Sequence, residues 1–362
     1  MKKIGVLTFH RTTNYGAIYQ TYALQKYLNE NCICEVIDYN NNTLVERYEL
    51  NPFKAKTIKQ FLKRIIYYRD NKKLVEEFKR FTKGYIKLST EKYNEQNITE
   101  ADKVYDLFIA GSDQIWNLEL SGYDLNYFSM FSKTKNKRNS YAASLGTSSL
   151  SEDKINIIKE VIPEQNFISI RESQGVDILK TLEMNCLKIN QNIDPVFLLS
   201  KKEWEKLMFN SKKNERYIMV YEVAYTNHLR DFAEKKAKEY NLKLYFFSAS
   251  NKKMKNAKNI SDASPEKFLE YIHDADYVIS SSFHGIALSI IFEKNFYYDI
   301  PNEKNSFSSR ITSLVSLLGL EDRSIQVNSN KKINYDNVKR IVEKEKEKSK
   351  KYLNKIIEIG CE

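Results

Sequence analysis

The chain has 362 residues, of which 42% are hydrophobic and 13% aromatic, a composition that supplies ordinary folded cores and argues against a disordered protein. The length favours two domains of ordinary size. Lysine and arginine outnumber aspartate and glutamate by 58 to 47, and the net charge of +11 admits acidic substrates or an anionic membrane surface as partners, whereas no RNA- or DNA-binding motif supports a nucleic-acid partner.

The chain opens with the pattern of a βαβ unit. Residues 3–9 read as a buried strand, the turn 10–16 leads into a helix over about 17–29, and residues 35–39 form a second strand. A dinucleotide-binding fingerprint would place G-x-G-x-x-G in that turn. Because the turn has only Asn14-Tyr15-Gly16-Ala17, the sequence argues against an NAD site of the usual Rossmann type.

Apolar residues at helical spacing follow, and they predict one or two amphipathic helices inserted over about 53–90. Further strands are expected over 105–110, 138–143 and 167–170. Another strand ends near Asn192-Ile193-Asp194-Pro195, because proline terminates it and favours extended geometry in the residue before it.

A second alternating series begins with a strand at residue 217. It continues as helix 227–240, strand 242–248, helix 264–274, strand 277–280, helix 285–292 and strand 295–299. Such alternation implies parallel sheets, so two series joined near 200–215 predict two Rossmann-like domains facing a cleft. We expect an N-terminal, acceptor-side domain over 1–200, a C-terminal, donor-side domain over 212–330, and a basic C-terminal helix within 331–362.

Several classes of protein are disfavoured by what the chain lacks. No apolar run reaches the ~18 residues of a membrane span, and the run at 4–9 is too short for a signal-peptide core. We therefore expect a cytoplasmic protein, whose basic segments at 54–87 and 331–355 are either solvated helix faces or a peripheral contact with the inner face of the cell membrane. A disulfide framework or a metal site is not expected, since no C-x-x-C pair or cluster with histidine is formed by Cys32, Cys34, Cys186 and Cys361.

The turn Ser282-Phe283-His284-Gly285 follows the strand 277–280 and begins a helix. Open α/β sheets bind ligands outside the carboxyl ends of their strands, and a helix N-terminus attracts anions. His284 can exchange a proton near neutral pH. The turn therefore predicts an anionic ligand and a proton transfer at one point, the alternative being a buried histidine capped by serines.

Two other strand ends carry more polar groups than a turn requires. In residues 111–117, the carboxylate of Asp113 and neighbouring side-chain amides lie close in sequence to Trp116. Hydrogen-bonding groups beside an apolar ring suit the binding of a sugar, but Trp116 can equally serve to anchor the loop. Arg171 follows the strand 167–170 and can offer a bidentate fork to a carboxylate or phosphate, or else pair with an adjacent acid. Arg310 begins a helix and is either directed to the same cleft as the histidine or a helix-start charge.

At these motifs the sequence resembles the polysaccharide pyruvyl transferase family. The resemblance implies a GT-B-like fold of two Rossmann-like domains, and an enzyme that transfers the enolpyruvyl unit of phosphoenolpyruvate to a sugar as a cyclic ketal. Many members carry arginine two residues before the histidine, where this chain has Ser282, so either Arg310 supplies the missing guanidinium or the donor differs. The matching segments, in order, are 5–10 with 14–17, 109–117, 169–173, 194–196 and 282–285.

The resemblance also implies the partners and the site. Phosphoenolpyruvate is the expected co-substrate, with no other cofactor and no metal, and the acceptor is a sugar of a cell-surface polysaccharide such as an exopolysaccharide, or its lipid-linked oligosaccharide precursor. Two rival functions stay open: a GT-B glycosyltransferase that uses a nucleotide sugar, and a non-catalytic glycan-binding relative. We expect as catalytic residues His284 and Asp113, as donor-binding residues Arg171, Ser282, Gly285 and Arg310, and as acceptor-binding residues His10, Asn14, Tyr15, Gln114, Trp116 and Asn117.

Overall fold

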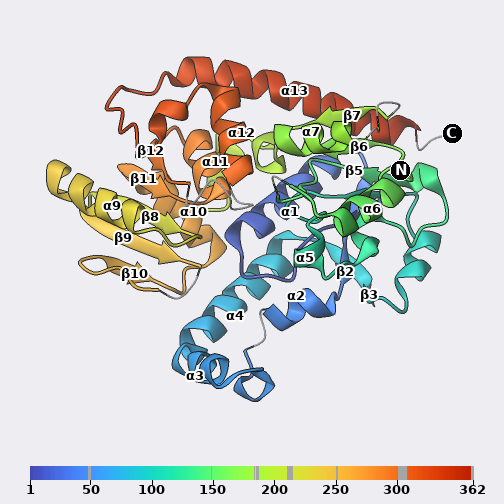
Figure 1. Ribbon diagram of the computed structural model, residues 1–362, viewed down its shortest axis with the longest axis horizontal. Helices are drawn as coiled ribbons and strands as arrows, with labels where there is room; N and C mark the ends of the chain where they lie inside the picture. Colours follow the sequence, from blue (N-terminus) through green and yellow to red (C-terminus); the bar gives the residue numbers. More distant parts are fainter. Residues whose placement is uncertain are drawn as a thin grey trace.

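The computed structural model describes residues 1–47, 50–147, 149–182, 184, 187–209, 215–249, 252–300 and 308–359. It contains two parallel five-stranded sheets, each flanked by helices (Figure 1). The expected GT-B-like architecture of two Rossmann-like domains is therefore confirmed. The boundaries proposed for the domains stay predictions.

The first sheet has the strand order β3-β2-β1-β4-β5. Its central strands are buried on both faces, as in β4, where every residue is buried, and such strands read as unbroken apolar runs. The strands are β1 (Lys3–Leu7), β2 (Ile33–Tyr39), β3 (Leu88–Tyr93), β4 (Leu107–Ala110) and β5 (Arg138–Ser140).

A short parallel pair extends this sheet beyond β5. The strands β6 (Ile168–Ile170) and β7 (Ile189–Gln191) pair with each other, and parallel bridges from Asn139 to Phe167 and from Ala143 to Ile170 join β6 to the strand before it. The carboxyl ends of β1, β4, β6 and β7 consequently point to one edge of the first domain.

Helices cover the faces of the first sheet and its extension. Between β2 and β3 the chain forms a helical excursion, α2 to α4, where the sequence predicts one or two amphipathic helices (Figure 1). The helices are α1 (Tyr15–Leu28), α2 (Asn42–Arg47), α3 (Ile58–Ile66), α4 (Tyr68–Tyr85), α5 (Leu118–Ser121), α6 (Glu152–Val161), α7 (Ser173–Thr181) and α8 (Lys201–Glu205).

The second sheet has the order β10-β9-β8-β11-β12. Its elements follow the predicted alternation closely, although the helix after β11 starts at Phe283 because the Ser282 side chain caps it. The strands are β8 (Tyr217–Glu222), β9 (Lys243–Ser248), β10 (Lys258–Ile260), β11 (Tyr277–Ser280) and β12 (Asn295–Tyr298), and the helices are α9 (Asn227–Tyr240), α10 (Pro265–Asp274), α11 (Phe283–Ile291) and α12 (Ser308–Leu318).

The two domains are joined through α1. The ring of Tyr15 stacks on Phe268 of α10 with 3.9 Å between the ring centroids, and its hydroxyl donates to the carbonyl of Ala263 at 2.7 Å. Tyr19, one turn later, donates to the carbonyl of Pro265 at 2.6 Å. These contacts fix the N-terminus of α1 against the second domain.

The last helix, α13 (Tyr335–Ile359), falls within the range 331–362 in which the sequence predicts a helix, and it lies across both domains (Figure 1). Its Tyr352 hydroxyl donates to the carbonyl of Ser140 at 2.9 Å, and Lys2 donates to the carbonyl of Ile357 at 2.6 Å. The helix therefore returns to the first sheet and ties the two domains together a second time. None of the described helices combines the length and the apolar character needed to cross a membrane.

Candidate active site

His284 lies at the start of α11 and faces the first domain. Its Nε2 is 3.4 Å from Oδ2 of Asp194, which follows β7. Its other side meets the first turn of α1 so closely that a Cβ added at Gly16 would lie 2.0 Å from Nδ1. The imidazole is 6% exposed, and Nε2 has no hydrogen-bond partner within the described part of the chain. A glycine at position 16 is thus required for the two domains to enclose the histidine.

Arg171, at the end of β6, lies beside the same carboxylate. Its Nη1 donates to Oδ2 of Asp194 at 2.5 Å, its Nε is 3.8 Å from Oε2 of Glu172, and its guanidinium lies 4.7 Å from the ring centroid of Phe283. Nε and Nη2 are buried without a hydrogen-bond partner among the described residues. Unmatched buried donors are costly, so this guanidinium can receive an acceptor that the described residues do not provide.

Arg310, from α12, brings a second guanidinium to the cluster. Its Nη1 is 3.9 Å from Oδ1 of Asp113. Burial, followed by the positive charge of Arg171, lowers the pKa of Arg310 to about 10. The Arg310 side chain remains a cation at neutral pH. Its lowered pKa reflects its burial and the positive charge of Arg171 nearby.

The turn after β4 presents Asp113 in an unusual backbone conformation. Its φ of 68° lies in the left-handed region, which is uncommon for residues other than glycine. The turn is made possible by Gly111, where φ is 135° and a Cβ would lie 2.1 Å from the carbonyl oxygen of Tyr141. Non-glycine residues held in this region often mark functional sites.

Asp194 connects the arginine to the histidine. Burial opposes its ionisation, but His284 and Arg171 outweigh burial and hold the pKa of Asp194 well below its usual range. Burial likewise opposes the charge of Arg171, and the neighbouring Asp194, Glu172 and Asp113 outweigh it and raise its pKa. Three carboxylates therefore face two guanidiniums in the cluster.

Two cavities flank this charged cluster. One, of about 140 Å³, is lined by Arg171, Asp194, Phe283 and Arg310 among others. The other, of about 220 Å³, lies on the side of Asp113 and of α2. Arg310 lines the smaller cavity and Asp113 the larger one, so this pair stands between the two.

The larger cavity contains several residues predicted to bind the acceptor: His10, Asn14 and Gln114 line it, with Asp113. His10 is fixed in place, because its Nε2 is 3.0 Å from Oδ1 of Asp38 and its Nδ1 is 3.2 Å from the carbonyl of Thr8. Asn14 lines the cavity while its side chain accepts from the backbone N–H of Gly16.

Three of the predicted acceptor-binding residues make structural contacts, and their binding role stays a prediction. Trp116 is 1% exposed, stacks on Phe128 and donates from Nε1 to the carbonyl of Tyr127 at 3.1 Å, so it offers no face to a sugar. Tyr15 is likewise buried in the contact between the domains. Asn117 caps α5 by accepting from the N–H of Leu120, and it does not line the cavity.

The prediction that backbone N–H groups at the start of α11 bind the donor stays a prediction, and two of these groups are used within the protein. The N–H of Gly285 donates to Oγ of Ser282 at 3.3 Å, and the N–H of Ser282 donates to Oγ of Ser280 at 3.0 Å. A Cβ at Gly285 would lie 2.6 Å from Oγ of Ser280, so this glycine serves packing. The serines thus bind two N–H groups of the helix start, as in the capped arrangement that the sequence left open.

Other residues of the cluster were not assigned a role from the sequence. Asp194 and Gly16 stood within recognisable motifs, but nothing in the sequence shows that they face His284 from opposite sides. Glu172 was considered only as a competitor for Arg171. The described residues contain no group of three or more His, Cys, Asp or Glu side chains arranged to hold a metal ion.

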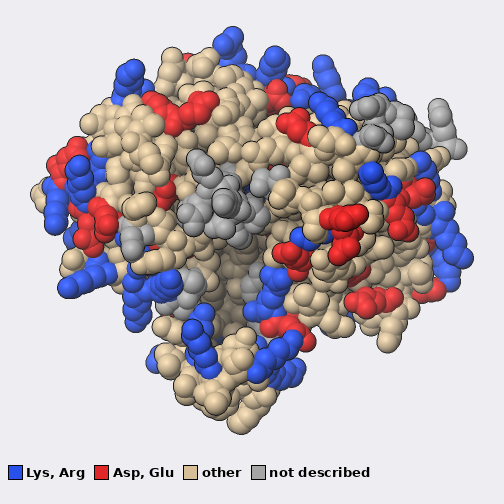
Figure 2. All heavy atoms as spheres, in the orientation of Figure 1, with Lys and Arg blue, Asp and Glu red and all other residues tan. Residues whose placement is uncertain are grey.

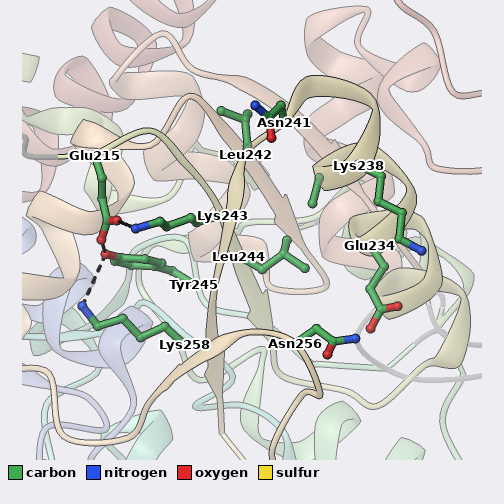
Figure 3. A pocket seen from close by; sticks show the side chains of 11 residues that line it. Glu215, Glu234, Lys238, Asn241, Leu242, Lys243, Leu244, Tyr245, Asn256 and Lys258 are labelled. Carbon is green, nitrogen blue, oxygen red and sulfur yellow. Dashed lines mark hydrogen bonds and ion pairs between the residues drawn. The ribbon is translucent and has the colours of Figure 1, made fainter.

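A larger hollow, of about 560 Å³, lies on β9, β10 and α9 (Figure 3). Its charged groups interact with one another: Glu215 contacts Lys243 and Tyr245, and Lys258 donates to the Tyr245 hydroxyl at 3.3 Å (Figure 3). None of the predicted site residues lines it, so we place the candidate site at the interdomain cluster.

The fold and this cluster define a two-domain α/β protein with a charged site between its domains. The family model described as polysaccharide pyruvyl transferase matches residues 14–298. This match covers most of the chain, and the chain belongs to the polysaccharide pyruvyl transferase family. It is accordingly an enzyme of the transferase class that acts in polysaccharide biosynthesis.

Comparisons with solved structures gave remote likenesses. A putative UDP-N-acetylglucosamine 2-epimerase from Listeria monocytogenes has a TM-score of 0.49 at 9% identity and covers 94% of each chain. UDP-GlcNAc 2-epimerase from Methanocaldococcus jannaschii has a TM-score of 0.46 at 12% identity, covering 94% of this chain and 91% of that chain. The E. coli heptosyltransferase WaaC with ADP has a TM-score of 0.38 at 10% identity, covering 95% and 99%. No curated protein matches in sequence.

Proposed function

We propose that this protein transfers a pyruvyl group from phosphoenolpyruvate to two hydroxyls of a sugar, forming a cyclic ketal on a cell-surface polysaccharide or its lipid-linked precursor. The observation that carries the proposal is the pair of buried, unmatched nitrogens on Arg171. Nε and Nη2 of Arg171 lack a hydrogen-bond partner among the described residues, while Nη1 binds the Asp194 carboxylate that also contacts His284. A compact anion bound to these two nitrogens would satisfy them.

The donor is placed in the smaller cavity. Its carboxylate accepts from Nε and Nη2 of Arg171, which present the planar fork that matches a carboxylate. Its phosphate lies toward Arg310, the second cation of the cluster. Asp113, Glu172 and Asp194 lie against the two arginines, and we assign to His284 the proton that the bound donor receives.

The reaction then needs only proton transfers and addition at one carbon. A proton is added to C3 of the enol, which makes C2 electrophilic. One sugar hydroxyl adds to C2, the C2–O bond to phosphate breaks, and the second hydroxyl closes the ketal. Of the two hydroxyl protons released, one replaces the proton given to C3 and the other leaves with phosphate. We assign these proton transfers to His284, whose Nε2 lies 3.4 Å from Oδ2 of Asp194.

The acceptor is placed in the larger cavity, where Asp113, His10, Asn14 and Gln114 provide hydrogen-bonding groups. Asp113 stands at the boundary between the cavities, 3.9 Å from Arg310, and is positioned to accept a proton from a sugar hydroxyl directed at C2. The chemistry calls for no cofactor beyond phosphoenolpyruvate, and we propose that it takes place in the cytoplasm, where that donor is made.

Thermal-shift measurements on the full chain test the proposal. Phosphoenolpyruvate is expected to raise the melting temperature, because a ligand that binds only the folded state stabilises it. UDP-GlcNAc and a CMP-sugar serve as comparison ligands and are expected to leave it unchanged. Stabilisation by a nucleotide sugar without stabilisation by phosphoenolpyruvate would contradict the proposal and favour a glycosyltransferase.

A further inference from the structure

Between α2 and β3 a helical lobe projects away from both sheets (Figure 1). It consists of the short turn η1 (Pro52–Lys54), α3 and the first half of α4. Although α3 is strongly amphipathic, none of its residues is buried. An amphipathic helix normally buries its apolar face in the core, so this face lacks the partner that its sequence implies.

The apolar side chains of the lobe are exposed to an unusual degree. Phe53 is 89% exposed, Ile58 80% and Ile66 70%, and Leu62 and Ile65 are about half exposed. Residues 58, 62 and 65 follow helical spacing and share one face of α3, with Ile66 at its margin. Exposed apolar residues gathered on one element mark a contact surface, whereas scattered single ones do not.

Basic residues border this apolar face. Lys59 and Lys63 are exposed, one turn apart on one flank of α3, and make no ion pair with the described residues. Arg64 lies on the opposite flank and donates to the carbonyl of Asn51 at 2.8 Å. The surface of the lobe accordingly shows lysine and arginine around uncharged atoms (Figure 2). Further lysines and arginines of the lobe are Lys54, Lys56, Arg69, Lys72 and Lys73.

We infer that η1 and α3 form an interfacial element that docks on the surface of an anionic lipid bilayer. The bilayer supplies both kinds of partner at once, with acyl chains for Phe53, Ile58 and Leu62 and anionic headgroups for the basic border. An apolar face with basic flanks on an exposed helix is typical of helices that bind at the surface of anionic membranes. This inference does not depend on the proposed reaction.

The position of the lobe connects docking with the site. The lobe follows α2 in the chain, and Leu44, Val45 and Arg47 of α2 line the larger cavity. In Figure 1, α2 and α3 lie on the same side of the molecule. Docking through α3 therefore brings the opening beside α2 toward the bilayer, where an acceptor carried on a lipid would be found.

Co-sedimentation of the full chain with vesicles tests the inference. Vesicles of phosphatidylcholine mixed with phosphatidylglycerol are expected to bind the protein, and vesicles of phosphatidylcholine alone to bind it much less. Because each basic residue near an anionic surface contributes on the order of fivefold to binding, Lys59→Glu with Lys63→Glu should weaken it by more than tenfold. The matched control, Lys344→Glu with Lys351→Glu on exposed positions of α13, is expected to retain binding.

A second variant separates the apolar contribution. Ile58→Ser, Leu62→Ser and Ile66→Ser together are expected to abolish sedimentation while leaving the melting temperature unchanged, since all three side chains are exposed. Val104→Ser with Val327→Ser, exposed elsewhere, is the control. Equal binding by both variants would overturn the inference. So would sedimentation velocity showing that the α3 substitutions convert a dimer to a monomer, because the face would then belong to a second copy of the chain.

Discussion

Asp194 follows β7 in the first domain and His284 lies in α11 of the second, yet Oδ2 of the aspartate lies 3.4 Å from Nε2 of the histidine. The same Oδ2 accepts from Nη1 of Arg171 at 2.5 Å. One carboxylate oxygen thus joins the proposed donor-binding guanidinium to the proposed acid and base. Closure of the two domains around this atom is what assembles the site, and neither domain contains the whole set.

Replacing Gly16 tests how tightly the domains enclose the histidine. Gly16→Ala would place a Cβ 2.0 Å from Nδ1 of His284, so the ring or the domain contact must shift. A displacement of about 1 Å can cost roughly a hundredfold in rate, and we expect turnover of phosphoenolpyruvate to fall by that order. Gly84→Ala is the control, because Gly84 is also helical and a Cβ there meets nothing within 4 Å. Equal turnover in the two variants would show that the ring is not confined.

Asp194 is expected to make stability depend on pH. Its folded-state pKa lies below that of the unfolded chain, about 3.9, so its ionised form contributes stability above that pH and the contribution is lost as the pH falls toward the folded value. Asp194→Asn should therefore cost roughly 3 kcal/mol at neutral pH, with a difference from wild type that narrows below about pH 4. Urea unfolding across this range measures it. Asp177→Asn, at an exposed position, serves as the control, and its free energy of unfolding relative to wild type is expected not to change with pH in this way. If the free-energy difference for Asp194→Asn stays constant with pH, the proposed coupling between Asp194 ionisation and stability is refuted.

Arg310 is expected to act through its planar guanidinium and not only through its charge. Arg310→Lys should weaken phosphoenolpyruvate binding almost as much as Arg310→Ala, since an ammonium group cannot make the bidentate contact. Because the pKa of Arg310 is about 10, donor affinity should also fall as the pH rises through that value. Calorimetry at several pH values measures both effects. In Arg310→Ala, donor affinity should no longer fall at high pH. If it still falls there, the pH dependence belongs to another group.

The buried position of Trp116 leads to a prediction about stability instead of binding. Trp116→Phe removes the hydrogen bond to Tyr127 and part of the stack on Phe128, and we expect a loss of about 1–3 kcal/mol in the free energy of unfolding. The Michaelis constant for the acceptor should not change. A raised constant in a protein of unchanged stability would restore Trp116 to the acceptor site.

The sequence predicts the alternation of strands and helices well, because buried parallel strands are continuous apolar runs and the helices between them are capped and periodic. It predicts less well where an element stops. The strand expected over 138–143 ends at Ser140, and Ala142 has a φ of 46°, which no regular strand accommodates. Such a break depends on the neighbouring chain and carries no local signal.

The candidate site shows the same limit. Motifs placed His284, Asp113 and Arg171 at strand ends, which parallel topology brings to one edge of each sheet. Whether a polar or aromatic residue there is open to a ligand depends on distant partners. Tyr15 is covered by Phe268, and Trp116 by Phe128, and no pattern around either residue reveals that cover.

The most direct test of the account is the affinity of phosphoenolpyruvate for the full chain and for two arginine variants, measured by calorimetry. Arg171→Ala removes the fork with its two unmatched nitrogens, and we expect a loss of about 1.5–3 kcal/mol, tenfold or more in affinity. Arg323→Ala is the matched control, because Arg323 is equally buried and pairs with Asp322 away from the cluster. The account predicts weakened binding in the first variant alone. Unchanged affinity in a folded Arg171→Ala protein would contradict it.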